Sequence, residues 1–213
     1  MERTSRPWWA ALSTGTSFAV PTRWTAWSDK AWQHVSLVDF DADGDDDLAN
    51  LNGVWWVGLS SGNGFGTAAR WGAWSHLAWD AVGTFDANGD GRMDVYAFRR
   101  GAWYVGLSNG SAFAIGLRST RKDAAWKDAV VGDFDGDGRD DLAARLAGGW
   151  WVNLSSVTGG AGAISRWTSW QDIAWQNVTV GDFDGDGRDD MAGRSGSQWW
   201  TAASTGSSFS TSL

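Results

Sequence analysis

Apolar residues occur along this chain in short runs that Gly, Ser and Asp interrupt. One stretch shows the pattern well, with apolar-rich segments at 129–131, 142–145, 150–154 and around 164–167. Segments of three to six residues, separated by turn signals at a spacing of about 8–12 residues, are typical of strands in an all-β sandwich or barrel. No window of convincing length has a helical period. We therefore expect an all-β protein.

The pattern repeats along the chain. Acidic clusters begin at Asp39, Asp86, Asp133 and Asp182, which lie 47, 47 and 49 residues apart. A period of about 40–50 residues made of short strands narrows the prediction to a β-propeller of four-stranded blades. Aromatic pairs recur in step with the acidic clusters: Trp8 and Trp9, Trp55 and Trp56, Trp103 and Tyr104, Trp150 and Trp151, and Trp199 and Trp200.

The repeats define the expected domain organisation. We expect a single repeat domain over residues 1–213, divided into a half unit at 7–38 and further units at 39–85, 86–132, 133–181 and 182–213. Repeats of 47–49 residues then number about 4.5. A closed ring leaves no open edge strand, so we predict about five blades with one incomplete, or a propeller completed by oligomerisation.

A third repeated marker has the form Trp-x-x-Trp-x-x-x-x-Trp. It occurs as Trp24, Trp27 and Trp32, as Trp71, Trp74 and Trp79, and as Trp167, Trp170 and Trp175; the remaining copy keeps Trp126 but has Arg118 and Arg121. Two interpretations stay open. The indoles either pack between blades, which are buried on both faces, or offer exposed faces to sugar rings. In the packing case, the two arginines must be exposed or lie over aromatic rings.

The sugar-platform interpretation names specific candidates and a criterion. Its candidate ligand-binding residues are the first two tryptophans of each complete motif: Trp24, Trp27, Trp71, Trp74, Trp167 and Trp170. An indole can stack on a ligand only where its face is accessible. Burial of these side chains would therefore remove the main support for this interpretation.

Negative charge is concentrated in four nine-residue loops: loop 1 (39–47), loop 2 (86–94), loop 3 (133–141) and loop 4 (182–190). They hold 19 of the 25 acidic residues of a chain with a net charge of −8. Loop 3 reads Asp-Phe-Asp-Gly-Asp-Gly-Arg-Asp-Asp, and Ca²⁺ takes about six to eight oxygen ligands from such alternating positions. Several like charges within nine residues repel one another, and a turn without a bound cation has no reason to accept that cost. An EF-hand is excluded because position 12 offers no Glu.

We therefore predict about four Ca²⁺ ions per chain, one in each loop. Glycine at position 6 suits the sharp turn that brings positions 5 and 7 to one ion. The expected ligands are positions 1, 3, 5, 7 (through its backbone carbonyl) and 9, namely Asp39, Asp41, Asp43, Asp45 and Asp47; Asp86, Asn88, Asp90, Arg92 and Asp94; Asp133, Asp135, Asp137, Arg139 and Asp141; and Asp182, Asp184, Asp186, Arg188 and Asp190.

The pattern Asp-x-Asp-Gly-Asp-Gly-x-x-Asp at this spacing resembles the FG-GAP or VCBS repeat of integrin α-subunits and integrin-like lectins. Loops 3 and 4 match it without exception, and the resemblance covers nearly the whole chain. It implies calcium binding in the loops and a propeller of four-stranded blades. Loop 1 departs by Ala42 and Asp45, and loop 2 by Asn88, which removes a carboxylate.

The remaining composition limits the function. There is no cysteine, no apolar run of the roughly 20 residues that a membrane span needs, and no basic stripe for nucleic acid. The two histidines, His34 and His76, occupy non-equivalent places, and no catalytic motif appears, so we expect no enzyme and no catalytic residues.

The expected function is a binding module for carbohydrate, by analogy with integrin-like lectins. The alternative is a structural or adhesive protein-interaction scaffold of a larger secreted or surface protein, and a secreted enzyme comes third. The half unit is also compatible with a homo-oligomer. Oxygen-only calcium loops suit millimolar calcium, so we expect an extracellular or cell-surface location.

Overall fold

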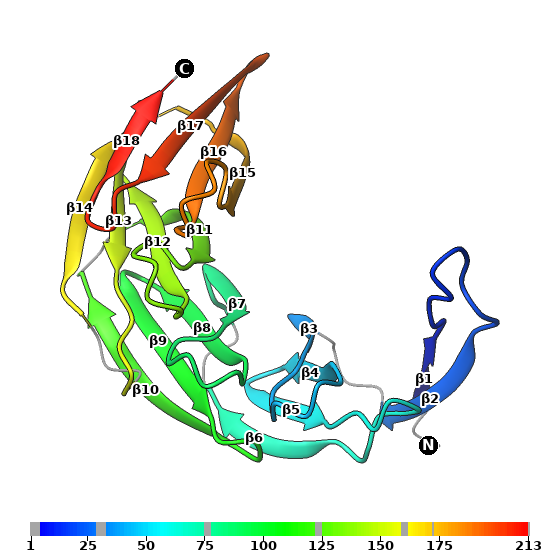
Figure 1. Cartoon of the computed structure of the whole chain (residues 1–213). Coiled ribbons are helices and arrows are strands. Elements are labelled where there is room, and N and C mark those ends of the chain that lie inside the picture. Colours follow the sequence, from blue (N-terminus) through cyan, green and yellow to red (C-terminus); the bar gives the residue numbers. More distant parts are fainter. Residues whose placement is uncertain are drawn as a thin grey trace. The chain divides into compact units, whose positions relative to one another are not determined.

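The computed structural model describes residues 5–28, 33–74, 78–121, 125–158, 162–171 and 173–212. All regular structure in these residues is β-strand, which confirms the all-β class (Figure 1). No helix in these ranges is long and apolar enough to cross a membrane. The chain divides into two compact units, one of residues 1–77 with 108–114 and the other of 78–107 with 115–213. The predicted single domain over 1–213 stays a prediction.

The described strands form five antiparallel sheets. A two-stranded sheet pairs β1 (Ser5–Ala10) with β2 (Thr22–Ser28). Four sheets of four strands follow: β3 (Val35–Val38), β4 (Asp47–Leu51), β5 (Val54–Gly58) and β6 (Ala69–Ala73); β7 (Ala81–Phe85), β8 (Asp94–Arg99), β9 (Ala102–Ser108) and β10 (Phe113–Thr120); β11 (Lys127–Gly132), β12 (Asp141–Leu146), β13 (Gly149–Asn153) and β14 (Ile164–Ser169); and β15 (Gln176–Gly181), β16 (Asp190–Ser195), β17 (Gln198–Ser204) and β18 (Phe209–Ser212).

Each four-stranded sheet follows the order of the chain, so every strand pairs with its neighbours in sequence. The four strands expected between residues 129 and 167 are confirmed as β11–β14. The acidic loops lie between the first and second strand of each sheet. The register shifts at Trp150 and Trp151 on β13, and a matching shift occurs at Trp55 and Trp56 on β5. Such bulges re-aim side chains at the aromatic pair.

The aromatic pairs bury side chains on the sheet faces, as strand alternation predicts. The first members Trp55, Trp103 and Trp150 are fully buried, whereas their successors Trp56 and Trp151 are half-buried. In the second unit, Trp150 shares a core with Met191 and Phe209 of the next sheet. Neighbouring sheets of this unit therefore pack face to face, so a sheet that lies between two others has both faces buried.

The last sheet differs from the others on one face. Trp199 is 51% exposed and Phe183 is 51% exposed, although the equivalent Trp150 and Phe134 are fully buried. In β7–β10 and β11–β14 the first member of the aromatic pair instead packs in a core shared with the following sheet. The face of β15–β18 that carries Trp199 is therefore accessible to solvent.

Candidate functional site

The first aspartate of each acidic loop organises the loop backbone. In loop 3, Asp133 Oδ1 accepts hydrogen bonds from the backbone N–H groups of Gly136 (2.7 Å) and Asp137 (3.0 Å), and its Oδ2 accepts one from Gly138 (2.8 Å). The other loops repeat this arrangement around their first aspartate. One side chain thus curls the following five residues into a tight turn.

Glycine at the sixth position has the conformation that this turn requires. Gly44, Gly91, Gly138 and Gly187 have φ between 82° and 93°, in the left-handed region. Side chains with a Cβ rarely adopt this conformation, whereas glycine enters it without a steric penalty. The role that sequence spacing predicts for this glycine is consistent with the backbone observed.

The ninth aspartate closes each loop from inside the protein. Asp141 is fully buried; its Oδ2 accepts the N–H of Phe134 (3.1 Å) and its Oδ1 the N–H of Ser155 (2.7 Å). Asp47 and Asp190 are held in the same way. Burial raises the pKa of Asp141 to about 7 and that of Asp47 to about 6, against the backbone hydrogen bonds that lower them. Burial is thus the dominant influence on the pKa of both carboxyls, and neighbouring aspartates raise it further.

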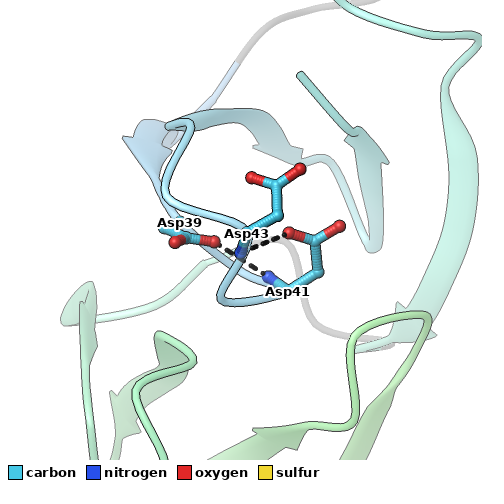
Figure 2. Close-up of side chains that lie close together, drawn as sticks. All are labelled: Asp39, Asp41 and Asp43. Carbon is cyan, nitrogen blue, oxygen red and sulfur yellow. Dashed lines mark hydrogen bonds between the residues drawn. The ribbon is translucent and has the colours of Figure 1, made fainter. Parts of the chain in front are cut away.

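Carboxylate oxygens converge in three of the loops, as Figure 2 shows for loop 1. The converging groups have ligand atoms within 4.8 Å of one another: Asp39, Asp41 and Asp43; Asp133, Asp135 and Asp141; and Asp182, Asp184 and Asp190. Oxygens bound about 2.3–2.6 Å from one Ca²⁺ lie no further apart than about 5 Å. Asp135 Oδ1 is buried without a hydrogen-bond partner. Both observations fit a divalent cation bound by oxygen.

The fifth and seventh positions behave differently from the other expected ligands. Arginine occupies position 7 in three loops, and its Nη2 pairs with the carboxylate at position 5: Arg92 with Asp90, Arg139 with Asp137 and Arg188 with Asp186. Loop 1 has Asp45 at position 7 instead, and there Asp43 joins the converging group. An arginine side chain has no oxygen, so the backbone carbonyl is the only oxygen that these residues at position 7 offer to a cation.

Loop 2 is the exception among the four. The Asn88 side-chain amide donates to Asp90 Oδ2 (2.9 Å), and Asp86 holds the backbone of the loop as in the other copies. In the described residues, no group of three acidic side chains converges in loop 2. The expected ligands Asp86, Asn88, Asp90 and Asp94 thus share a loop without forming the cluster seen elsewhere.

The eighth position of loops 3 and 4 was missed by sequence reasoning. Asp189 Oδ2 accepts the N–H of Asp133 (3.0 Å), and the N–H of Asp189 donates to the carbonyl of Asp133 (2.7 Å). Asp140 makes the same two bonds with Asp86 (2.8 and 2.9 Å). Burial raises the pKa of both acidic side chains. These pairs connect the first residue of one loop to the next loop; an acid recurring at position 8 was the available signal.

The tryptophans proposed as sugar platforms are mostly buried. Trp27, Trp71, Trp74, Trp167 and Trp170 are each at most 8% exposed, and Trp24 is half-buried. Trp71 packs edge-on against Phe113 with ring centroids 5.1 Å apart, and Trp167 lies 5.0 Å from Phe209. Their surroundings therefore support a role in packing. Because their indole faces are mostly inaccessible, the criterion stated above counts against them as exposed sugar platforms. Trp32 and His76 lie outside the described residues, and His34 is exposed.

The two arginines of the third motif copy adopt different positions. The guanidinium of Arg121 lies over the Trp151 ring, 4.1 Å from its centroid, as a cation–π partner. Arg118 is 9% exposed and therefore buried, so it meets neither outcome expected from the sequence. Its Nε and Nη2 have no hydrogen-bond partner.

A pocket of about 290 Å³ lies in the second unit, between β14 and the β15–β18 sheet. Three indoles contribute to it: Trp170, Trp175 and Trp200, with Trp175 and Trp200 nearly perpendicular (87°) and their centroids 6.3 Å apart. The remaining lining is mostly polar: Ser169, Gln171, Ile173, Ser195, Gln198 and Thr211. Aromatic faces beside hydroxyl and amide groups are a composition suited to a polyhydroxylated ligand. Of the six tryptophans named as sugar-binding candidates from the sequence, Trp170 alone lines this pocket.

Comparison with known proteins gives a match to the model of the FG-GAP-like repeat over residues 86–144 and 133–193. No curated protein matches the sequence. The fold is similar to that of an Agrocybe aegerita lectin, described as recognising non-reducing terminal N-acetylglucosamine, with a TM-score of 0.84 and 21% identity. That alignment covers 96% of this chain and 60% of the lectin chain, so this chain spans less than two thirds of the lectin.

A second solved structure of similar fold is the Photorhabdus luminescens Tc holotoxin pore. Its TM-score is 0.55 at 17% identity, over 99% of this chain and 11% of that one. At such identities both likenesses concern the fold alone. Together with the sheets described above, they support a propeller-like architecture.

Proposed function

We propose, because the chain belongs to the FG-GAP-like repeat family, that it is a non-catalytic binding module whose acidic loops hold calcium and whose indole-lined pocket takes a carbohydrate. The observation that carries the calcium part is the convergence of carboxylates in loops 1, 3 and 4. The observation that carries the carbohydrate part is the pocket around Trp175 and Trp200.

The calcium proposal rests on charge as well as distance. Asp141 and Asp190 lie buried beside other carboxylates of their loops, and Asp135 has a buried oxygen without a partner. Holding several negative charges this close is unfavourable in a medium of low dielectric constant. A bound calcium ion would supply the missing positive charge, and the loop residues would supply its oxygen ligands.

Calcium binding can be measured on the whole chain. We expect EDTA to lower the melting temperature strongly, because each site contributes about 2.7 kcal/mol when free calcium is a hundredfold above its dissociation constant. Asp135→Asn, which alters a single loop, should lower the calcium stoichiometry in isothermal titration calorimetry by one. A melting curve that exhaustive chelation leaves unchanged would exclude the proposal.

The carbohydrate would bind in the pocket and not on the buried tryptophans that the sequence named. A hexose ring presents an apolar face that can lie on an indole and hydroxyl groups that can bond to amide and hydroxyl side chains. The pocket offers both, with Trp200 half-buried and Gln171 and Gln198 exposed at its edge. The fold likeness to a lectin specific for N-acetylglucosamine suggests the first ligand to try.

The chain provides its own matched control for this test. Trp199 and Trp200 are neighbours on β17 and point to opposite faces; Trp200 lines the pocket, whereas Trp199 is exposed and outside its lining. We expect Trp200→Ala to weaken retention on immobilised N-acetylglucosamine by about tenfold, the equivalent of about 1.4 kcal/mol of lost stacking. Trp199→Ala should bind like the parent. Failure of the calcium-loaded parent to bind any glycan on an array would exclude the proposal.

The finer architecture and setting are part of the proposal. We infer that the sheets are blades of a propeller of about five blades, one of them incomplete, or of a ring that a second chain completes. Light scattering distinguishes the two, since only the second gives the mass of a dimer or larger assembly. An extracellular or cell-surface location agrees with calcium loops that work at millimolar calcium.

A protein-interaction scaffold is the second candidate, and a specific surface favours it. Phe183 and Trp199 expose large apolar side chains on the last sheet. Exposed apolar groups of this kind are found at protein-interaction sites. If glycans fail to bind while Trp199→Ala abolishes capture of a protein ligand, the scaffold is the function.

A further inference from the structure

Loop 2 differs from the other loops at two neighbouring positions. Position 2 is Ala87, where the other loops have Phe40, Phe134 and Phe183. Position 3 is Asn88, where the others have aspartate. At positions 1, 3, 5 and 9 the loop therefore has one carboxylate fewer than the other loops, and a much smaller side chain stands beside its ninth residue.

A third difference lies on the strand that packs beside this position. In the copies that contain loops 1 and 3, a tryptophan contacts the phenylalanine of position 2. The ring centroids of Trp71 and Phe40 lie 6.0 Å apart, and those of Trp167 and Phe134 lie 6.5 Å apart. The equivalent residue on β10 is Arg118. By the repeat, Arg118 thus takes the place beside position 2 of loop 2, where the small Ala87 leaves room for its side chain.

Position 2 is in direct contact with the ninth aspartate in every loop. The N–H of Ala87 donates to Asp94 Oδ2 (3.1 Å), and Asp94 is fully buried. A guanidinium beside Ala87 consequently lies near the carboxylate that would face the metal. Burial lowers the pKa of Arg118, and the charge of Asp94 opposes that effect, which is consistent with this placement.

Arg118 is also a buried cation with two nitrogens that lack a hydrogen-bond partner. It is 9% exposed, and its Nε and Nη2 are both unpaired. Guanidinium groups stay protonated in proteins, so a positive charge is fixed here. A buried charge is tolerated where an opposite charge compensates it.

On the basis of the proposed calcium binding, we propose that Arg118 is a built-in counter-ion of loop 2 and lowers the calcium affinity of that loop. Asn88 in place of an aspartate removes a negative charge that would attract Ca²⁺, and the fixed positive charge of Arg118 repels Ca²⁺. Both lower the calcium affinity of loop 2. The chain then binds three calcium ions tightly, in loops 1, 3 and 4, and a fourth weakly in loop 2.

The test compares calcium binding by the full chain and its variants in isothermal titration calorimetry. The parent should show three tight sites and a fourth at least about tenfold weaker, a difference that one nearby unit charge readily produces. Arg118→Met keeps an unbranched side chain but removes the charge, and should strengthen the fourth site about tenfold. Asn88→Asp should strengthen it as well.

Two controls separate charge from packing. Arg118→Lys retains the charge and should leave the fourth site weak. Arg121→Met removes an arginine three residues further on, which lies over Trp151, and should leave all calcium affinities unchanged. If Arg118→Met does not fold, Arg118→Gln, which also removes the charge, takes its place.

Each outcome bears on one proposal. Four equally tight sites in the parent, or a fourth site that stays weak when the charge of Arg118 is removed, would overturn the role of Arg118 while leaving calcium binding intact. Absence of any calcium binding by the parent would instead overturn the proposed function. Three tight sites with a fourth that Arg118→Met restores would establish the counter-ion.

Discussion

The buried carboxylate of Asp141 should make the stability of the calcium-free protein depend on pH. In the folded chain its pKa is raised from 3.8 to about 7 by burial, and that of Asp47 to about 6. The unfolded chain has ordinary aspartate pKa values. Between about pH 4 and pH 7 the folded chain therefore holds protons that the unfolded chain has released.

The sign of the effect follows from this difference. Below about pH 4 both states are protonated, and the stability of the calcium-free protein is fully present. As the pH rises through the folded pKa values, the buried carboxylates must ionise without a counter-ion, and stability falls. Asp182 has its pKa lowered, chiefly by the hydrogen bond from Gly187, so it acts below this window.

The magnitude can be worked from the raised values. A change from 3.8 to about 7 for Asp141 corresponds to about 4 kcal/mol, at about 1.4 kcal/mol per unit. For a chain of this size, that is roughly 8–16 °C in melting temperature. Bound calcium would remove the penalty by compensating the charge, so the gap between calcium-loaded and calcium-free protein should widen by about this amount from pH 4 to pH 7.

The assay is thermal unfolding followed by tryptophan fluorescence, in EDTA and in excess calcium, in steps across this pH range. Asp141→Asn, which cannot ionise, serves as the matched variant and should lose part of the pH dependence in EDTA. A calcium-free melting temperature that stays constant or rises between about pH 4 and pH 7 would refute the reasoning.

Three further predictions follow from packing, from the contact between loops and from the pocket. Replacing Trp71 and Trp74 by Ala should destabilise the fold by several kcal/mol in urea unfolding, at about 3–5 kcal/mol for each buried indole; unchanged stability with lost glycan binding would contradict their packing role. Asp189→Ala should cost about 1–3 kcal/mol by leaving the N–H of Asp133 without its acceptor, and Asp189→Asn, which keeps an acceptor oxygen, should cost less in the same assay. N-acetylglucosamine should protect the fluorescence of the parent from quenching by acrylamide but not that of Trp200→Ala; equal protection in both would place the ligand elsewhere.

Local features of the chain were determined by the sequence alone. The period of 47–49 residues, the four strands of each unit and the curl of the acidic loops all depend on residues that lie close together in the chain. In loop 3, for example, the hydrogen bonds that shape the turn join Asp133 to residues three to five positions later. Short-range bonds of this kind can be predicted from spacing, because few conformations satisfy them.

Contacts between sheets were decided only by the tertiary structure. Trp167 and Phe209 lie 42 residues apart in the chain, and Asp133 and Asp189 lie 56 apart. Each pair joins different repeats, as do the walls of the pocket. The sequence names an indole but not whether the next sheet covers it, so Trp167 and Trp170 read equally well as packing residues or as sugar platforms. Burial separates the two roles, and burial depends on which neighbour packs against a face. The polarity and shape of a side chain, which are all that the sequence specifies, do not name that neighbour.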